Sequence, residues 1–271
     1  MTLPRLVALD IDGTILDHDE RLSDRVRDAV RAVAAGDSHV VVATGRALQG
    51  ALPVLDRLSL LDGYLVCSNG AVTVRLDPAQ ERGYEVVSQR MFDPTPALEL
   101  LREHLPEALY AVEVLGRGYK LTAPFPDGEL TGEMQIVPFE ELYAEPAMRV
   151  VVRSPAHTPQ QFVDLVNRVG LHGVAYSVGW TAWLDLAPDG VTKASALDAV
   201  RSWLHVDPAD TLAVGDGRND IEMLTWAARG VAMGNAPQEV RAAADEVCGD
   251  VVDDGLADVL EGLLAAGGAR S

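Results

Sequence analysis

Two aspartates, Asp10 and Asp12, stand two positions apart directly after the apolar run Leu6–Leu9, in the segment DIDGT. Residues two apart in an extended chain project to the same side, so both carboxylates are expected at the carboxyl edge of a sheet, where open α/β sheets bind their ligands. Neighbouring carboxylates repel unless a cation or a shared proton relieves them. A divalent cation with oxygen ligands is the simplest solution, and a solvated acidic turn is the alternative.

A hydroxyl and a lysine follow at two further element ends. Thr44 opens the segment TGR after the apolar run Val40–Ala43, and a hydroxyl beside exposed backbone N–H groups at a helix start can bind an anion. Lys193 stands just inside an expected helix, in a chain whose only other lysine is Lys120. A lysine ammonium is a flexible point charge that suits a phosphate. The simpler interpretations are a helix cap for the threonine and an exposed first-turn position for the lysine.

A second acidic loop, Gly215–Asp220 (GDGRND), follows the apolar run Thr211–Val214. It adds the carboxylates of Asp216 and Asp220 and the amide of Asn219 between an expected strand and an expected helix. Any one of these segments alone is compatible with a simple turn. Together, however, the segments favour a functional site. They supply acids, a hydroxyl, a lysine and acids again, and each group stands at the end of a strand or the start of a helix.

The elements that must position these residues alternate between strand and helix in both terminal parts. Short apolar runs suit strands that are buried on both faces, and segments with apolar residues at helical spacing separate them. The predicted strands are 6–9, 40–43, 64–67, 211–214 and 231–233, and the predicted helices are 23–36, 192–204, 220–227, 238–244 and 256–264. This alternation predicts right-handed βαβ units and an α/β fold with a Rossmann-like parallel-sheet core and helices on both faces.

The middle of the chain has a different pattern. Apolar and polar residues alternate at 110–114 and 182–186, as in an antiparallel sheet with one solvent-facing side. Helices are predicted at 96–104 and 159–169, the second with a capping box formed by Thr158 and Gln161. We therefore expect a Rossmann-like catalytic core made of residues 1–82 and 188–271, with an inserted α+β domain at 83–187.

Composition narrows the functional classes. The 271 residues fit one or two domains, and a net charge of −19 disfavours binding to nucleic acid or to anionic membranes. Two cysteines, Cys67 and Cys248, exclude a disulfide framework and fit a reducing compartment. The N-terminal segment lacks the pattern of a signal peptide, and no apolar stretch is long enough to cross a membrane. A cytoplasmic protein is expected.

In their order, the chemistry-bearing segments resemble the four motifs of the haloacid dehalogenase-like (HAD) superfamily: Asp10–Thr14, Thr44, Lys193 and Gly215–Asp220. Three further segments resemble its Cof-like phosphatase subgroup: Ser68–Ala71 (SNGA), Met233–Ala236 (MGNA) and Asp254–Gly255. This subgroup inserts a large cap between the second and third motifs, and the long stretch between Thr44 and Lys193 leaves room for one.

The resemblance implies a role for each motif residue. Asp10 would be the nucleophile that attacks phosphorus and becomes an aspartyl phosphate, and Asp12 would protonate the leaving alcohol and later take a proton from water. Mg²⁺ would be held by Asp10, Asp216 and the backbone carbonyl of Asp12, while Asp220 would support the loop and Lys193. The residues implied in binding the phosphoryl group or the substrate are Ile11, Thr44, Gly45, Arg46, Asn69, Lys193 and Asn219, of which Thr44 and Lys193 also count as catalytic.

The implied activity is hydrolysis of small phosphomonoesters, such as sugar phosphates or related metabolites, by a monomer or homodimer. Asp12 favours a phosphatase over a dehalogenase, because an alkoxide leaving group needs a proton and a halide does not. A phosphomutase would use the same motifs and stays open. A receiver-like signalling module also groups acids, a threonine and a lysine around Mg²⁺, but in a much shorter chain without an insertion.

In such a family the cap would close over the site and select the substrate. Residues of the insertion that are candidates to line its pocket are Arg117, Tyr119, Lys120, Trp180 and Trp183. A position in the core, in a turn or on the surface is the simpler interpretation of each.

Overall fold

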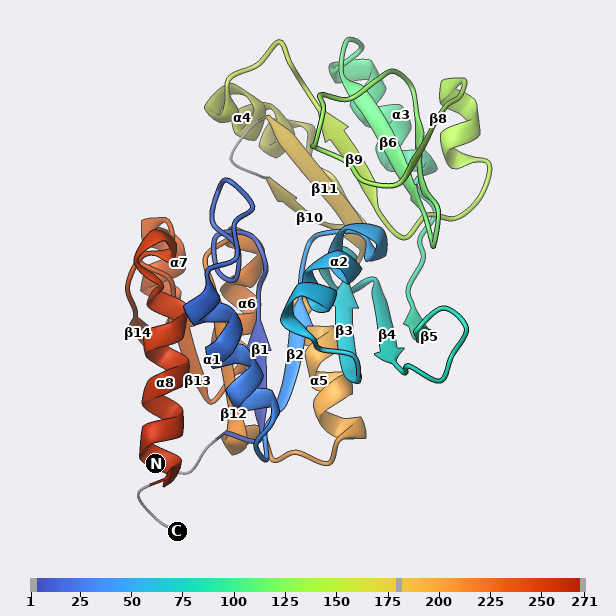
Figure 1. Cartoon of the computed structure of the whole chain (residues 1–271). Helices are drawn as coiled ribbons and strands as arrows, with labels where there is room; N and C mark the ends of the chain where they lie inside the picture. Colours follow the sequence, from blue (N-terminus) through green and yellow to red (C-terminus); the bar gives the residue numbers. More distant parts are fainter. Residues whose placement is uncertain (1–3, 179–181, 269–271) are drawn as a thin grey trace.

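The computed structural model describes residues 4–178 and 182–268, and these form two β-sheets, a larger one below and a smaller one above it in Figure 1. In spatial order, the eight strands of the larger sheet are β14 (Glu246–Val247), β13 (Arg229–Ala232), β12 (Thr211–Gly215), β1 (Leu6–Leu9), β2 (His39–Ala43), β3 (Gly63–Cys67), β4 (Val72–Leu76) and β5 (Tyr84–Gln89). Neighbouring strands from β14 to β3 are parallel, and β4 and β5 extend the edge as antiparallel strands.

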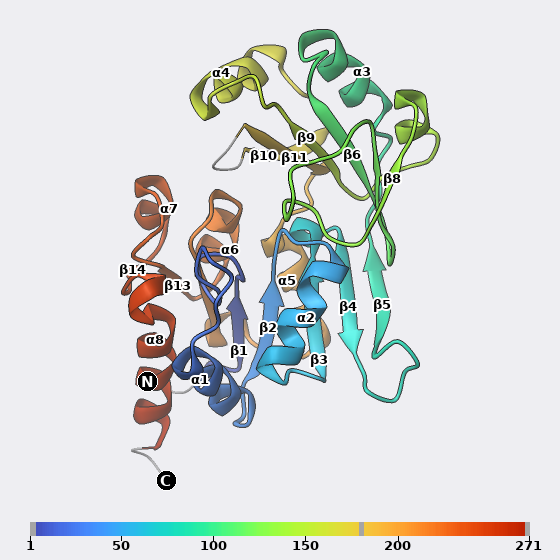
Figure 2. The same cartoon turned by 45° about the horizontal axis from the view of Figure 1, so that its top comes forward.

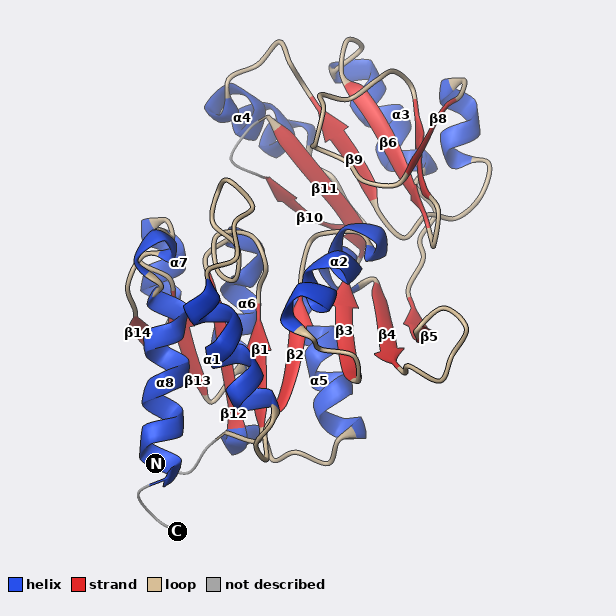
Figure 3. Ribbon diagram, in the orientation of Figure 1, coloured by secondary structure: helices blue, strands red, loops and turns tan. Residues whose placement is uncertain are grey.

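Helices cover both faces of the larger sheet (Figure 3). One face carries α1 (Asp24–Ala34), α2 (Leu48–Leu58) and α8 (Gly255–Gly268), and the other carries α5 (Lys193–Trp203), α6 (Ile221–Trp226) and α7 (Gln238–Ala243). Along β1, Val7 and Leu9 are buried in the first apolar cluster, whereas Leu6 and Ala8 are buried in the second. A strand between two helical layers is therefore apolar throughout, and the predicted α/β core is confirmed.

The smaller sheet is built from the middle of the chain. In spatial order, its strands are β10 (Val174–Val178), β11 (Trp183–Pro188), β9 (Val150–Arg153), β6 (Leu109–Val114), β7 (Gly118–Leu121) and β8 (Glu133–Ile136), antiparallel except for the pair β7–β8. Helices α3 (Thr95–His104) and α4 (Pro159–Val169) pack on one face. The other face is turned toward the larger sheet (Figure 2), and Ala47 packs there among Tyr119 and Val151.

Two details of the sequence prediction are resolved by local contacts. The capping box of α4 is confirmed, because Thr158 and Gln161 each accept a hydrogen bond from the other's backbone N–H.

Strand β5, however, pairs with β4 in the larger sheet and does not belong to the inserted part that the sequence places at 83–187. The loop between the two strands runs from Asp77 to Gly83, and the N–H of Asp77 donates to Gly83 O at 2.9 Å, so that β5 returns along β4. The chain therefore leaves the larger sheet after Gln89.

None of the helices in the described ranges combines the length and the apolar character that a membrane crossing requires.

Candidate active site

The loops after β1 and β12 and the start of α5 meet at the carboxyl edge of the larger sheet, on the side of the smaller sheet (Figure 1). Lys193 is the first residue of α5, and its Nζ donates hydrogen bonds to Asp10 Oδ1 at 2.6 Å and to Asp220 Oδ1 at 2.7 Å. Asp216 follows β12 in the adjoining loop, and all four side chains are buried. The structure thus brings together three of the four motif segments around one ammonium group.

The turn after β1 depends on Gly13, whose φ of +77° lies in the left-handed region that favours glycine. A β-bridge between Asp12 and Leu16 closes the turn, and Ile11 is fully buried in the apolar core. A Cβ atom at position 13 would overlap the carboxylate of Asp216. Glycine therefore allows the β1 and β12 loops to approach each other.

Asp220 fixes the loop that carries Asp216. Its Oδ2 accepts the backbone N–H groups of Asp216 at 3.0 Å and of Gly217 at 2.8 Å, while its Oδ1 accepts from Lys193. Both oxygens are occupied by these bonds. This arrangement is compatible with the supporting role that the resemblance implies for Asp220.

Three buried carboxylates around one ammonium leave the site short of positive charge. Burial and the nearby Asp220 and Asp216 raise the pKa of Asp10 well above its ordinary value, against the lowering effect of Lys193. Burial and Asp220 likewise raise the pKa of Asp216 to about 7. Burial disfavours the charged form of Lys193, but Asp10 and Asp220 outweigh it and raise the pKa of the ammonium group. An added cation would relieve the repulsion among the carboxylates.

The donor atoms fit such a cation. One carboxylate oxygen each from Asp10, Asp216 and Asp220 lie within 4.8 Å of one another. Because both oxygens of Asp220 are already engaged, Asp10 and Asp216 are the side chains that fit a metal. Each keeps one oxygen without a hydrogen bond to any residue in the described ranges. Hard oxygen donors of this kind suit Mg²⁺.

Asp12 lies nearer the surface than Asp10, with 57% of its side chain exposed. The guanidinium group of Arg46 donates to both of its carboxylate oxygens, at 2.9 Å from Nε to Oδ2 and 2.5 Å from Nη2 to Oδ1. The same Nη2 donates to Glu20 Oε1 at 2.8 Å. Arg46, to which the resemblance assigns substrate binding, is therefore paired with two carboxylates in this structure.

The other candidates for the phosphate site lie around the end of β2. Thr44 is fully buried, and its Oγ1 accepts the backbone N–H of Arg46 at 3.0 Å. Asn219 Nδ2 donates to Asn69 Oδ1 at 2.9 Å, and a Cβ atom on Gly45 would lie 3.1 Å from that oxygen. Gly45, Asn69 and Asn219 thus form one polar cluster beside the acids.

Asn235 is a site residue to which the sequence assigned no role. Its Nδ2 donates to Gly13 O at 2.9 Å and to Asp216 Oδ2 at 3.0 Å, and its Oδ1 accepts the N–H of Val251 at 3.0 Å. It therefore holds the carboxylate of Asp216 against the β1 turn. The available signal was the segment Met233–Ala236, which carries part of the resemblance to the Cof-like subgroup.

A buried polar network of the smaller sheet faces these loops. Arg149 donates from Nε to Asp185 Oδ1 at 2.6 Å and from Nη1 to the Tyr119 hydroxyl at 3.0 Å, and it lies 3.9 Å from Glu113. Glu113 accepts a hydrogen bond from Ser68 Oγ at 2.8 Å, which joins the two sheets. Burial raises the pKa of Glu113, although Arg149 and Ser68 lower it. The sequence did not indicate this network.

A pocket of about 320 Å³ lies between Asp12 and this network. Of the candidates that the sequence offers in the insertion, Tyr119 lines this pocket. Trp183 packs edge-on against Phe125, and Arg117 lies in an exposed hairpin 4.0 Å from Glu133. Lys120 is only partly buried and is not among the residues of this lining, and Trp180 lies outside the described residues.

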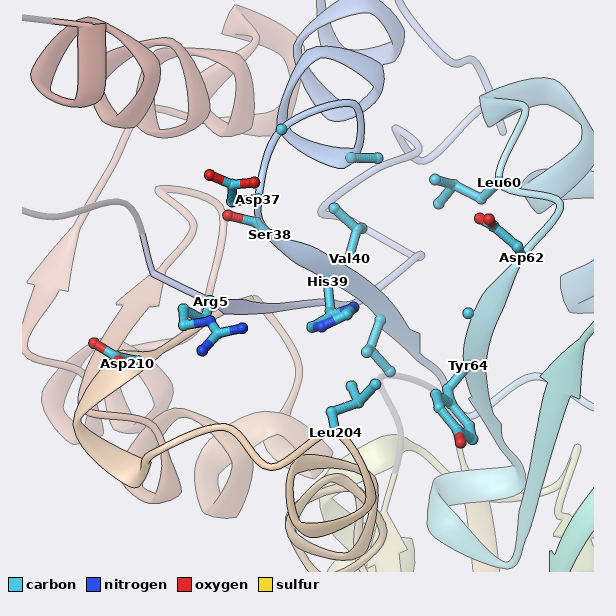
Figure 4. Close-up of a pocket in the computed structure, with 14 residues that line it drawn as sticks. Arg5, Asp37, Ser38, His39, Val40, Leu60, Asp62, Tyr64, Leu204 and Asp210 are labelled. Atoms are coloured by element: carbon cyan, nitrogen blue, oxygen red, sulfur yellow. The ribbon is translucent and has the colours of Figure 1, made fainter. Parts of the chain in front are cut away.

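A larger hollow, of about 990 Å³, lies at the opposite edge of the larger sheet (Figure 4). Arg5, His39 and Tyr64 line it at the beginnings of β1, β2 and β3. In the described part of the chain, none of the motif positions is in this lining. Open α/β sheets bind their ligands at the carboxyl ends of the strands, so the smaller pocket beside Asp12 is the better candidate for a substrate.

Comparison with known proteins agrees with this geometry. Residues 7–260 match the family model of the haloacid dehalogenase-like hydrolases. Phosphoglycolate phosphatase from Natronomonas pharaonis is 30% identical over 94% of this chain and 96% of that protein, and a putative phosphatase from Streptococcus pyogenes is 28% identical over 94% and 97%. A HAD phosphatase from Bacteroides thetaiotaomicron superposes with a TM-score of 0.78 at 25% identity, covering 96% of this chain and 94% of that one. This chain belongs to the haloacid dehalogenase-like hydrolase family, in its Cof-like group, and is one of its phosphatases.

Proposed function

We propose that this phosphatase hydrolyses small phosphomonoesters, such as sugar phosphates or related metabolites, with Mg²⁺ and through an aspartyl-phosphate intermediate. The observation that carries the proposal is the buried contact of Lys193 with Asp10, beside the carboxylate of Asp216. A nucleophile, a phosphate-binding cation and a metal-binding carboxylate then meet at one point. Phosphoryl transfer needs this combination of positioning and charge neutralisation.

The reaction has two steps. The Asp10 carboxylate attacks phosphorus, the bond from phosphorus to the leaving oxygen breaks, and the Asp12 carboxyl group gives its proton to that oxygen. Water then attacks phosphorus and gives a proton to the Asp12 carboxylate, while the bond from phosphorus to Asp10 breaks. Phosphate leaves, and both aspartates return to their starting forms.

Arg46 orients the side chain of Asp12. Its guanidinium group donates to both carboxylate oxygens of Asp12 and so restricts the directions in which that carboxyl group can point. Its contact with Glu20 gives the guanidinium group a second acceptor when Asp12 carries the proton. Arg46 is thus a positioning residue for the acid and base.

The phosphoryl oxygens are held by Lys193 and by backbone N–H groups after β1 and β2, with Thr44 and Asn219 beside them. A bound Mg²⁺ would supply further neutralisation of phosphoryl charge. Asp10, Asp216 and the backbone carbonyl of Asp12 would hold it.

The inserted part, from the end of β5 to the end of β11, acts as a cap. Two features support this role. Its face without helices lies toward the carboxyl edge of the larger sheet (Figure 2), and the pocket beside Asp12 takes its walls from both parts. Closing such a cap excludes water and selects the substrate.

The test is release of phosphate from p-nitrophenyl phosphate with Mg²⁺, with EDTA, and by an Asp10→Asn variant. We expect turnover that needs the metal and is lost in the variant, whereas Asp28→Asn on the exposed surface of α1 keeps it. Metal-independent turnover, or activity retained without the Asp10 carboxylate, would overturn the proposal.

A further inference from the structure

The turn between β3 and β4, residues Ser68–Gly70, braces the loop that follows β2. The backbone N–H of Ser68 donates to Arg46 O at 2.9 Å, and that of Asn69 donates to Thr44 O at 3.1 Å. In the proposed function the loop 44–46 holds phosphoryl oxygens. The position of this loop therefore depends on the position of the turn.

The shape of the turn is imposed by its surroundings. Its three residues have positive φ values, +51° at Ser68, +54° at Asn69 and +101° at Gly70. This region is uncommon for serine, and a residue stays in it only where its contacts hold it there. A Cβ atom on Gly70 would overlap the carbonyl oxygen of Thr192, the residue before Lys193. The turn is thus packed against the start of α5 as well as against the loop 44–46.

The cap reaches the same turn through one buried carboxyl group. Ser68 Oγ lies 2.9 Å and 2.8 Å from the two carboxylate oxygens of Glu113 in β6, and both side chains are buried. Close by, Ala47 packs among Tyr119 and Val151 of the cap. Apolar contacts of that kind are non-directional, whereas a hydrogen bond requires a particular distance and angle. The bond between Ser68 and Glu113 therefore fixes where β6 lies over the turn.

Glu113 is also joined to the wall of the pocket beside Asp12. Its backbone N–H donates to Arg149 O at 3.0 Å across the pair β6–β9. The guanidinium group of Arg149 binds Asp185 and the Tyr119 hydroxyl, and these three residues line the pocket. Glu113 itself is not in that lining. It connects the pocket wall to the turn without meeting a ligand in the pocket.

We infer that Glu113 is a positioning residue, whose hydrogen bond with Ser68 holds the pocket wall of the cap and the loop 44–46 in one fixed arrangement. The inference rests on the proposed function, in which that loop holds the phosphoryl group and the pocket takes the leaving group. Without the hydroxyl of Ser68, the carboxyl group of Glu113 would be buried with a lost donor, which is costly. A cap moved away from the turn would return this group to water, so the arrangement in the structure would become less populated.

A double-mutant cycle tests whether the two residues act through their bond. We expect Ser68→Ala and Glu113→Ala each to lower kcat/KM for p-nitrophenyl phosphate by about 10-fold. The double variant should be no less active than the weaker single variant, because the bond is already absent. Glu113→Gln keeps an acceptor for the hydroxyl and should stay within about 3-fold of the wild type. Losses that multiply in the double variant, or equal losses in the Gln and Ala variants, would overturn the inference.

Hydrogen exchange gives a second readout that does not depend on turnover. We expect Glu113→Ala, a change in the cap, to speed exchange of the Ser68 and Asn69 amides by about 10-fold, with the amides of β12 unchanged. Glu140→Ala, at an exposed glutamate of the cap that pairs with Arg102, is the matched control and should alter neither exchange nor activity. Unchanged exchange at the turn would overturn the inference, and so would a rise throughout the larger sheet, which would indicate general destabilisation.

Failure of the inference and failure of the proposed function give different results. Metal-dependent turnover by the wild type, with independent effects of Ser68 and Glu113, would overturn the inference alone. Absence of any metal-dependent turnover of p-nitrophenyl phosphate by the wild type would overturn the proposed function, and the inference with it.

Discussion

Lys193 Nζ lies 2.6 Å from Asp10 Oδ1, although 183 positions separate the two residues in the chain. The lysine side chain is fully buried and that of Asp10 is 7% exposed. Charge-assisted hydrogen bonds in such surroundings are strong and directional. Because the same ammonium group binds Asp220, one cation holds together the β1 loop, the start of α5 and the β12 loop.

Removal of this ammonium group should damage both activity and stability. We expect Lys193→Met to lower kcat by about 10²-fold or more, and to destabilise the metal-free protein by about 3–5 kcal/mol, since buried carboxylates lose their partner. Phosphatase assays and urea unfolding measure the two effects. Lys120→Met, at the chain's other lysine, is the matched control and should change neither. A Lys193→Met enzyme with more than a tenth of normal activity would contradict the assigned role.

Metal affinity should depend on pH near neutrality. Asp216 has a pKa of about 7 in the metal-free site, and a cation must displace its proton, so Mg²⁺ binding should weaken as pH falls below about 7 and should release protons. Calorimetric titrations in buffers of different ionisation enthalpy detect this release. Binding that is equally tight at pH 5.5 and pH 8, without proton release, would count against Asp216 as a ligand.

The same raised pKa values predict the pH dependence of stability without metal. The folded protein retains protons on Asp10 and Asp216 that the unfolded chain releases. The free energy of unfolding should therefore fall as pH rises from about 4 toward 7. Urea unfolding across this range tests the sign, and Asp216→Asn should flatten the slope. A free energy of unfolding that rises steadily from pH 4 to 7, with or without this substitution, would contradict the assigned shifts.

The loss of activity on removal of the Asp12 carboxyl group should increase with the basicity of the leaving group. Asp12→Ala should lower kcat/KM for an alkyl phosphate by about 10²-fold or more, and for p-nitrophenyl phosphate much less, because nitrophenolate departs without a proton. Comparing the two esters in one variant cancels any general effect of the lost contact with Arg46. Equal losses on both esters would refute the assignment of Asp12 as the acid.

Gly13 offers a test of the approach between the β1 and β12 loops. Gly13 and Gly83 have nearly the same φ, +77° and +75°, but a Cβ atom at 83 would meet nothing within 4 Å, whereas one at 13 would overlap Asp216. Both alanine variants should therefore lose about 1–2 kcal/mol from backbone strain. Only Gly13→Ala should also weaken Mg²⁺ binding and activity. Equal Mg²⁺ affinity and activity in the two variants would show that the site does not depend on the close approach of Gly13 to Asp216.

The parallel core and the motif loops were predictable because they depend on short-range patterns. Apolar runs that end in acids, as at Asp10 and Asp216, mark the carboxyl ends of buried strands, and topology then brings those ends together. The pairing of Arg46 with Asp12 and Glu20 depends on the relative orientation of two loops, and the spacing of residues along the sequence does not reveal that orientation. The same holds for Glu113, Arg149 and Asp185, since their contacts follow from the register of antiparallel strands.

The measurement to make first is rapid acid quenching of the enzyme during turnover of p-nitrophenyl phosphate with Mg²⁺, followed by mass spectrometry of its peptides. The wild type and the Asp12→Ala variant, which lacks the base for the second step, should carry one phosphoryl group on the peptide that contains Asp10, with more of it in the variant. The Asp10→Asn variant should carry none. Steady release of phosphate with no phosphoryl group on Asp10 in either active form would contradict the aspartyl-phosphate mechanism.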